Sequence, residues 1–457
     1  MEKKYITSTA KVLINIWNIG MFAIVWCLFY NDFTFDSYKV PGAIMSCIIY
    51  AIIYIFLCRI YKAFRIASMR IWESVLTQII CFGIADVIMY IECCLIFNLI
   101  VSLIPGIIAV CAQIIGTTCL ITGFKKFIVR HVPPQNTTVI YGKNISGMEI
   151  NEFTKALSKK YPHLFQITKR LSEDEIENCM EQTVEEASTM LLYEVSHRTR
   201  KKVMSLTLEA KKNLYFTPTI EDITLQGCSE KHLLDTPLLK YGYVYENPME
   251  YRGKRLFDIA ASLVVLVLMS PFMLLVALAI KIEDRGPIFY KQTRCTKNGQ
   301  RFEIIKFRSM IVDAEKHGFV PCTSGDARIT KVGNVLRRIR FDELPQLINI
   351  LKGDMSFVGP RPERIEHVEM YMKELPEFAY RMRVKGGLTG YAQIFGKYNT
   401  SAYDKLRLDL MYIENQSFLL DLKLLMLTLK VLFIPESTEG FTEEKSGQIR
   451  GEEEEKK

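Results

Sequence analysis

Apolar runs and soluble-like segments follow one another along the chain in a simple order. Apolar runs dominate the first 125 residues and return at 256–280, while the segments after each have an ordinary balance of charged and apolar positions. A helix needs about 20 mostly apolar residues to cross a bilayer. The first region holds four such stretches, at approximately 12–30, 40–59, 75–95 and 101–122. The pattern therefore predicts a four-helix α-helical membrane region over 1–128.

Basic residues gather on one side of these predicted spans. Lys and Arg precede the first span and follow the second and the fourth, whereas the loop at 31–36 has neither. Because cytoplasmic loops carry the excess of Lys and Arg, both ends of the region are expected in the cytoplasm. The first run is too long for a cleaved signal peptide, and no small-x-small cleavage site follows it.

The segment 129–245 alternates strand-like and helix-like runs. Strands are expected at 138–142, 164–168 and 189–194, with helices over 148–158 and after a capping-box start at 171–175. Such alternation predicts a small α/β domain with a parallel sheet. The turn at 142–147 lacks the full G-x-G-x-x-G pattern and an acidic ribose partner, so a degenerate fold used for assembly or regulation is favoured over cofactor binding.

The second apolar stretch, 256–280, is interrupted near its middle by Ser270-Pro271. Its length permits a fifth membrane crossing, but Lys and Arg stand on both sides of it. A proline in mid-run bends a helix, and a neighbouring serine can satisfy the freed backbone groups in lipid. The favoured interpretation is a hairpin that enters and leaves by the same face; a true span is the alternative.

The basic C-terminal region holds the candidate chemistry. Two strands are expected at 288–292 and 302–307 around an Asn298-Gly299 turn. Apolar positions recur at helical spacing over 344–351, with Pro345 suited to the first turn and Gly353 to the end. This puts Asp342 and Glu343 at the start of that helix, where negative charge is favoured.

An acidic pair at a helix start is often only a cap. Here several cations surround it in sequence: Lys306, Arg308, Arg337, Arg338, Arg340 and Arg361. Cations and a metal ion that offset phosphate charge, beside a carboxylate that attacks phosphorus, are what phosphoryl transfer requires.

Composition narrows the partners. The formal net charge of +8 suits nucleic acid, anionic lipid or phosphorylated substrates, and the membrane segments favour the last two, with no nucleic acid. Twelve cysteines without a paired C-x-x-C spacing support neither a zinc site nor a disulfide framework.

Several ordered motifs between about 250 and 435 carry a resemblance to a known family. They are Lys254-Arg255-Leu256-Phe257-Asp258, Lys306-Phe307-Arg308-Ser309-Met310, Asp342-Glu343-Leu344-Pro345-Gln346-Leu347, the run from Gly353 to Pro362, and Gly387-Leu388-Thr389-Gly390. This segment closely resembles the bacterial sugar transferase family, the polyprenyl-phosphate hexose-1-phosphate (phosphoglycosyl) transferases. The N-terminal half resembles the long form, which has four membrane helices and a degenerate Rossmann-like domain.

The resemblance implies a monotopic α/β catalytic domain with a re-entrant membrane helix broken at Ser270-Pro271. It implies that Asp342 attacks the sugar-bearing phosphate of a UDP-sugar and releases UMP, after which undecaprenyl phosphate intercepts the phosphosugar–aspartyl intermediate. Glu343 and a Mg²⁺ ion belong to the same centre, so both acids are the expected metal ligands.

Further positions are expected to bind substrate. They are Lys306, Arg308, Arg337, Pro360, Arg361, Pro362, Lys397 and Asp409. At Lys397 the family more often has Arg; Lys keeps the charge but not the fork that holds phosphate bidentately.

The domains expected are thus 1–128, 129–245 and 250–435, with an amphipathic interfacial helix at 417–434 and a disordered tail at 436–457. The resemblance implies a multi-pass protein of the bacterial inner membrane, with its catalytic domain on the cytoplasmic face and a possible homodimer. Glucose or galactose is the expected sugar, transferred to initiate exopolysaccharide, capsule or O-antigen synthesis.

Two other functions are weighed against this one. A membrane glycosyltransferase would move the sugar without its phosphate and release UDP, but the D-x-D metal motif expected of it is missing. A non-catalytic scaffold for polysaccharide assembly would have no need of the acidic pair and its cations together.

Overall fold

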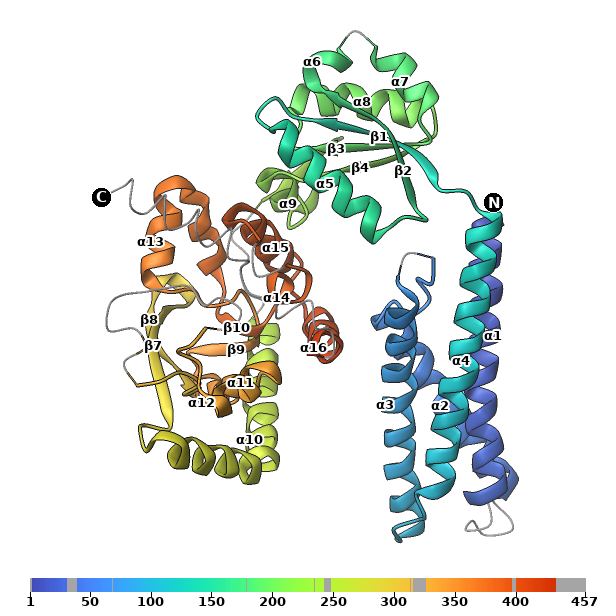
Figure 1. The fold of residues 1–457 in the computed structure, drawn as a ribbon, viewed down its shortest axis with the longest axis vertical. Helices are drawn as coiled ribbons and strands as arrows, with labels where there is room; N and C mark the ends of the chain where they lie inside the picture. Colours follow the sequence, from blue (N-terminus) through green and yellow to red (C-terminus); the bar gives the residue numbers. More distant parts are fainter. Residues whose placement is uncertain are drawn as a thin grey trace. The chain divides into compact units, whose positions relative to one another are not determined.

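The computed structural model describes residues 2–30, 39–67, 69–177, 179–233, 235–241, 248–312, 314, 326–396 and 400–432. The chain divides into two compact units, Met1–Thr217 and Pro218–Lys457, both drawn in Figure 1. Lys397 and the tail predicted at 436–457 lie outside the described residues.

The first unit begins with four long helices, as the apolar pattern predicted. They are α1 (Glu2–Val25), extended by a π-helical turn at Trp26–Tyr30, α2 (Lys39–Ile60), α3 (Ile71–Phe97) and α4 (Ile104–His131). Each is long and apolar enough to cross a membrane. Large apolar side chains such as Ile16, Ile52 and Ile107 are exposed on the outside of this bundle, where lipid rather than water is their natural solvent.

A polar chain crosses the interior of the bundle with one side chain from each helix. Asn18 donates to the Tyr54 hydroxyl at 3.0 Å, and Tyr54 donates to Gln78 Oε1 at 2.8 Å. Thr117 completes it by donating to Asn18 Oδ1 at 3.1 Å. In lipid, the hydrophobic effect does not drive apolar helix faces together. Hydrogen bonds between polar side chains therefore help to specify which helices pair.

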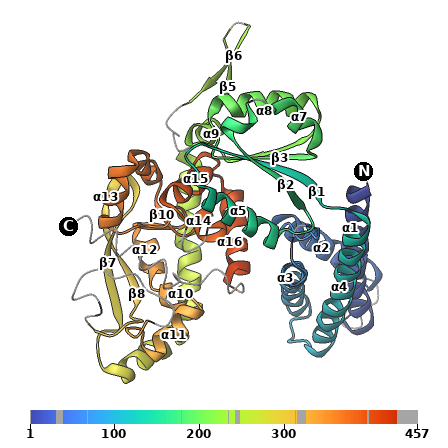
Figure 2. The same cartoon turned by 45° about the horizontal axis from the view of Figure 1, so that its top comes forward.

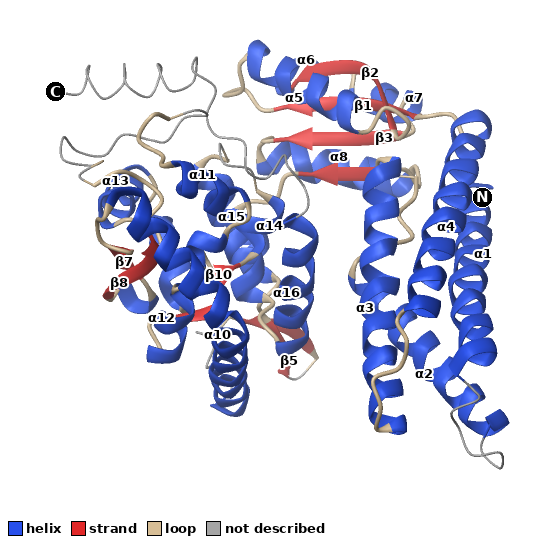
Figure 3. Ribbon diagram, turned by 60° about the horizontal axis from the view of Figure 1, so that its bottom comes forward, coloured by secondary structure: helices blue, strands red, loops and turns tan. Residues whose placement is uncertain are grey.

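The rest of the first unit is the predicted α/β domain with a parallel sheet. Its strands are β1 (Gln135–Tyr141), β2 (Phe165–Ser172), β3 (Thr189–Tyr193) and β4 (Asn213–Phe216). All three pairings are parallel, in the order β2-β1-β3-β4, and Figure 3 shows the strands side by side. Helices α5 (Gly147–Lys160), α6 (Glu173–Ile176), α7 (Met180–Glu186) and α8 (His197–Glu209) connect them. The capping box predicted at 171–175 is present between Ser172 and Glu175.

The second unit opens with short elements before its long helix. They are α9 (Ile220–Leu225) and the antiparallel hairpin of β5 (Ser229–Leu233) and β6 (Thr236–Lys240), which projects in Figure 2. Ile220 and Ile223 of α9 share a buried cluster with Leu347 and Ile350, so this segment is part of the core of the second unit.

The remaining elements surround that core. They are α10 (Pro248–Asp284), β7 (Phe289–Cys295), β8 (Arg301–Phe307), α11 (Lys331–Arg338), α12 (Gln346–Lys352), β9 (Met355–Val358), α13 (Ile365–Glu374), β10 (Gly386–Thr389), α14 (Tyr391–Phe395), α15 (Ala402–Glu414) and α16 (Phe418–Leu432). The hairpin predicted around Asn298-Gly299 is confirmed, since β7 and β8 pair antiparallel. The predicted helix after the acidic pair is α12, with Pro345 at its N-cap and Gly353 ending it at a φ of 97°.

Helix α10 bends sharply into two limbs, which Figure 1 shows clearly. Pro271 lies inside it and has no N–H to donate to the Val267 carbonyl four residues earlier. The Ser270 hydroxyl donates to that same carbonyl at 2.8 Å. The serine thus satisfies the backbone carbonyl that the proline leaves without a donor.

The first turns of α10 hold the C-terminal core by its backbone. Arg255 donates to the carbonyls of Ile350 at 2.5 Å and Leu351 at 2.7 Å, at the end of α12. Asp258, which is buried, accepts the Phe357 N–H at 3.2 Å in β9. These contacts fix the first turns of α10 to α12 and β9, the segments next to the candidate site.

Lys254 makes a further contact of this kind. It donates to the Val358 carbonyl at 3.2 Å and pairs with Asp421 of α16. The amphipathic pattern at 417–434 correctly predicted a helix, but its Asp421 is buried. An acidic residue in that apolar run is therefore an internal ion-pair partner.

Strands β9 and β10 pair in parallel, and the backbone segments at their ends lie so close together that glycine is required at Gly387 in β10 and at Gly359 just after β9. A Cβ on Gly387 would lie 2.1 Å from the Gly359 nitrogen, and one on Gly359 would lie 2.3 Å from the Lys385 oxygen. Both contacts are with backbone, which cannot move aside as a flexible side chain can. This close approach sets the path of the chain into Pro360-Arg361-Pro362.

We expect Gly387→Ala to destabilise the second unit by about 1–3 kcal/mol, the usual effect of forcing extra atoms into a packed site. The matched control is Gly253→Ala in α10, where a Cβ meets nothing within 4 Å and helix propensity favours alanine. Thermal unfolding of both variants in detergent tests this. Equal unfolding temperatures for the two variants would contradict the close approach of β9 and β10.

Candidate active site

The acidic pair lies at a sharp change of chain direction. Helix α11 ends at Arg338, and Asp342 and Glu343 occupy a 3-10 turn, Phe341–Glu343, immediately before α12. Arg340, which lies between the end of α11 and this 3-10 turn, adopts the left-handed conformation with a φ of 55°. A non-glycine residue there costs about 1–2 kcal/mol, and such strain is concentrated at functional sites.

Glu343 is held by two cations from different parts of the chain. Its Oε1 atom lies 3.0 Å from Lys306 Nζ of β8 and 2.7 Å from Arg361 Nη2. Burial alone would raise the pKa of the Glu343 carboxyl, but Arg361 and Lys306 outweigh it and hold that pKa well below its ordinary value. Glu343 is therefore ionised and fixed in place.

Asp342, the neighbour of Glu343, differs from it in its partners and in the direction of its pKa shift. It is half-buried, and among the described residues its carboxylate has neither a hydrogen-bond partner nor an ion-pair partner. Burial raises the pKa of Asp342, a shift that Lys306 opposes and Glu343 reinforces. A carboxylate that is desolvated and not engaged by a partner is more available for attack than one clamped by two cations.

The other cations expected at the site take up distinct positions. Arg337 donates from Nε to the Ser309 hydroxyl at 2.8 Å, and together with Lys306 and Arg361 it opposes the rise that burial causes in the pKa of Asp342. Arg340 is half-buried close to Glu343, and burial lowers its pKa. Arg308 is buried and pairs with Asp284 at the end of α10, so it ties the membrane helix to β8.

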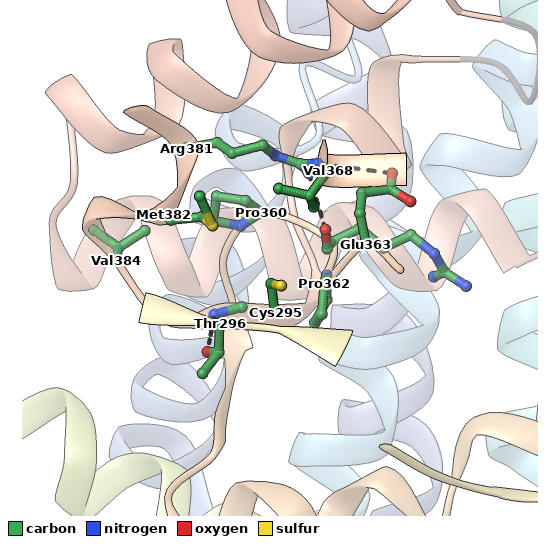
Figure 4. Close-up of a pocket in the computed structure, with 11 residues that line it drawn as sticks. Cys295, Thr296, Pro360, Pro362, Glu363, Val368, Arg381, Met382 and Val384 are labelled. Carbon is green, nitrogen blue, oxygen red and sulfur yellow. Dashed lines mark hydrogen bonds and ion pairs between the residues drawn. The ribbon is translucent and has the colours of Figure 1, made fainter. Parts of the chain in front are cut away.

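Two arginines fix the Pro360-Arg361-Pro362 segment by hydrogen bonds to its backbone carbonyls. Arg381 donates to the Arg361 carbonyl at 2.9 Å, and Arg294 donates to the Pro362 carbonyl at 3.2 Å. Figure 4 shows Arg381 and Glu363 beside this segment, at a hollow lined also by Cys295 and Thr296. The hollow measures about 20 Å³, room for little more than one water, so it is a packing feature and not a substrate pocket.

Asp409 lies in the same network and not on an open surface. Its side chain is 1% exposed and pairs with Arg381 at 2.7 Å. Burial raises the pKa of Asp409 to about 6, although Arg381 opposes the shift. In this structure the residue acts on Arg361 through Arg381, and direct contact with substrate stays a prediction.

Sequence reasoning did not identify Arg381, Arg294 and Glu363 as site residues. Arg381 lies in the 3-10 stretch Pro376–Arg383, outside the recognised motifs, and only its 4% side-chain exposure distinguishes it from a surface arginine. Glu363 lies 3.7 Å from Arg381, and the charges around it outweigh the effect of burial and lower its pKa. A buried charge needs a partner, and that need is invisible until the fold is known.

The donor set for a metal ion is small. The described residues contain no group of three or more His, Cys, Asp or Glu side chains that could hold one. The hard oxygens of Asp342 and Glu343 are compatible with Mg²⁺, which commonly takes one or two carboxylates and completes its shell with water and substrate phosphates.

Comparison with known proteins locates the similarity in this unit. The family model described as bacterial sugar transferase matches residues 249–435. A UDP-N-acetylgalactosamine-undecaprenyl-phosphate N-acetylgalactosaminephosphotransferase of Aeromonas hydrophila is 41% identical over 194 residues, which are 42% of this chain and 46% of that protein. Two UDP-glucose:undecaprenyl-phosphate glucose-1-phosphate transferases are also similar. That of Klebsiella pneumoniae is 38% identical over 218 residues (47% of this chain, 45% of that protein), and that of Caulobacter vibrioides 40% over 184 (39% and 69%).

The chain thus covers less than half the length of the Aeromonas and Klebsiella proteins and over two thirds of the Caulobacter protein. The matched family segment contains Asp342, Glu343, Lys306 and Arg361.

The two acids should differ in their effect on stability. We expect Glu343→Gln to destabilise the protein by about 1–3 kcal/mol, because it leaves Lys306, which is 17% exposed, and the partly exposed Arg361 without their shared charged partner. Asp342→Asn removes a charge that burial disfavours, so its unfolding temperature should equal or exceed that of the parent. Thermal unfolding near pH 7 measures both. A larger loss in Asp342→Asn than in Glu343→Gln would show that the roles of the two acids are reversed.

Proposed function

Because this chain belongs to the bacterial sugar transferase family, we propose that it transfers a sugar-1-phosphate from a UDP-sugar to undecaprenyl phosphate and releases UMP. The observation that carries the proposal is a contrast between the two acids: Glu343 pairs with two cations, whereas Asp342 pairs with none of the residues that the structure describes. Its product, a sugar linked by a diphosphate to a lipid, initiates exopolysaccharide, capsule or O-antigen synthesis.

Asp342 is the nucleophile in this proposal. Its carboxylate oxygen forms a bond to the phosphorus that bears the sugar, and the bond from that phosphorus to the bridging oxygen breaks, so that UMP leaves with both electrons. A phosphate oxygen of undecaprenyl phosphate then attacks the same phosphorus. The Asp342–phosphorus bond breaks, and the free carboxylate is restored.

The cations around the dyad stabilise the charge that develops. Lys306 and Arg361 are held by Glu343, so they are positioned before the donor arrives and do not reorganise during the reaction. Asp409 and Arg381 support Arg361 through its backbone. In this proposal Glu343 organises the cations while its neighbour forms the bond.

A Mg²⁺ ion is proposed at the same centre, held by Asp342 and Glu343 together with oxygens of the donor. When bound it neutralises diphosphate charge and supports UMP as a leaving group. Lys306 and Arg361 occupy one oxygen of Glu343, which leaves its other oxygen and the carboxylate of Asp342 as the protein donors.

For the sugar, glucose and galactose remain the proposed donors. N-acetylgalactosamine joins them as a candidate, because the Aeromonas relative is named for it. A test with purified protein therefore needs all three UDP-sugars.

The membrane arrangement is also a proposal. The outward apolar side chains of α10, such as Leu256, Leu268 and Leu275, are exposed, and Ser270 satisfies the backbone at the Pro271 bend. These features support a re-entrant helix in the inner membrane, with the catalytic domain on the cytoplasmic face as the distribution of basic residues favours. Homodimer formation is proposed from the resemblance to long-form relatives.

The α/β domain of the first unit is proposed to be a degenerate Rossmann-like fold without a cofactor. In open parallel sheets, ligands bind where the strand order reverses, which here is between β1 and β3. A Cβ on Gly142 would lie 2.0 Å from the Glu194 oxygen, so the loops after these strands are in contact. Glu173 accepts the Ser196 N–H at 2.7 Å, so a carboxylate of the protein itself occupies the N-terminus of α8, a position that favours an anion.

Release of UMP without acceptor tests the covalent step. We expect protein incubated with Mg²⁺ and the correct UDP-sugar to release about one UMP per active site, and to turn over only when undecaprenyl phosphate is added. Asp342→Asn should release none, whereas Asp404→Asn, which alters an acid that is 54% exposed on α15, should behave as the parent. Acceptor-dependent UMP with no initial release would exclude the aspartyl intermediate, and release of UDP would indicate a glycosyltransferase instead.

The raised pKa of Asp342 predicts a pH dependence for that first release. Only the ionised carboxylate attacks, and a raised pKa means that protonation begins at a higher pH than for an ordinary aspartate, near 3.9. The rate of initial UMP release should therefore fall as the pH is lowered, with a midpoint above that value. A rate that stays constant down to pH 4 in folded protein would contradict the assignment.

A further inference from the structure

A hollow lined by basic residues lies in the first unit. It is at the end of the helix bundle that holds the start of α3 and the last turns of α4. It measures about 120 Å³, several times the roughly 10–15 Å³ that a single water needs. Arg70 and Lys125 line it from the bundle, and Lys159, Lys160 and His163 line it from the α/β domain. Its lining contains no acidic side chain.

These residues come from three separate segments. Arg70 is the N-cap of α3, Lys125 lies toward the end of α4, and Lys159 and Lys160 form the last turn of α5. The acid that faces this group, Glu73, accepts the Arg70 backbone N–H at 3.4 Å and belongs to the start of α3. The hollow therefore collects positive charge from elements that are far apart in the sequence.

Two of the lysines are already oriented. Lys125 donates to the Met69 carbonyl, which ties α4 to the loop before α3. Lys160 lies over the Tyr161 ring at 5.6 Å. Within the part of the chain that the structure describes, neither Lys159 nor Lys160 forms an ion pair with an acidic side chain. An anion in the hollow would therefore meet Lys159 and Lys160 without displacing an acidic side chain of the described residues from either lysine.

Membrane topology and the helix dipole explain each basic residue of the hollow separately, but they do not explain why these residues come together in one place. Membrane topology favours Arg70 and Lys125 at a cytoplasmic end, and the helix dipole favours lysines at the end of α5. Neither effect requires two folded parts to face one another across a hollow with cations on both sides. Like charges brought together raise the electrostatic energy unless an anion offsets them.

The position of the hollow indicates which anion it takes. It lies at the level where α3 and α4 leave the apolar region, on the side that carries the basic loops. Anionic phospholipids make the cytoplasmic leaflet negative, and basic pockets beside membrane helices bind their headgroups. We propose that this hollow binds the phosphate of an anionic phospholipid headgroup and so holds the α/β domain against the bilayer surface. This inference does not rest on the proposed catalytic function.

Native mass spectrometry of the full chain in detergent, titrated with phosphatidylglycerol, tests the site. We expect the double variant Lys159→Gln, Lys160→Gln to bind its tightest phosphatidylglycerol at least tenfold more weakly, since each lysine near a membrane surface contributes about a factor of five. The matched control is Lys201→Gln, Lys202→Gln, which removes two adjacent exposed lysines from α8 of the same domain. Equal binding by the two double variants would overturn the proposal.

Two further arms identify the source of the phosphate. Phosphatidylcholine, which has the phosphate but no net charge, should bind much more weakly than phosphatidylglycerol to the parent protein. Millimolar inorganic phosphate should not displace phosphatidylglycerol. Displacement by inorganic phosphate would assign a soluble anion to the hollow and overturn the lipid proposal.

Discussion

The candidate site depends on one buried carboxylate that receives two cations. Glu343 brings Lys306 from β8 and Arg361 from the segment after β9 to a single oxygen atom. These three residues come from separate segments of the sequence. Because an ion removed from water must be paired, each of the three fixes the other two. Among the described residues the adjacent Asp342 forms no ion pair, although Lys306, Arg337 and Arg361 lie near it.

Helix α12 transmits this arrangement to the membrane helix. Asp342 and Glu343 lie in the turn just before it, and Asn349 in its middle donates to the Glu303 carbonyl at 2.7 Å and accepts the Ile305 N–H at 3.0 Å, which fixes β8 and Lys306 beside it. At its end, Arg255 of α10 takes two of its carbonyls. The first turns of α10 and the acidic pair are therefore held at opposite ends of the short helix α12.

The sequence predicted those features that depend on local pattern. Apolar length located the membrane helices, alternation located the parallel sheet, and Pro345 with Gly353 delimited α12. Features that depend on long-range pairing were missed. Nothing in the sequence around Arg381 indicates that it donates to the Arg361 carbonyl. Asp421 has the sequence pattern of a surface residue, but it is buried and pairs with Lys254. Such pairs form only when the fold brings distant charges together, so periodicity does not reveal them.

The central claim is that Glu343 organises the cations and Asp342 forms the covalent bond. The most direct measurement is to incubate the protein with its UDP-sugar in the absence of acceptor, digest it, and locate the added sugar phosphate by peptide mass spectrometry. Fragmentation should place the modification on Asp342. A modification on Glu343, or on any other residue, would contradict this division of roles.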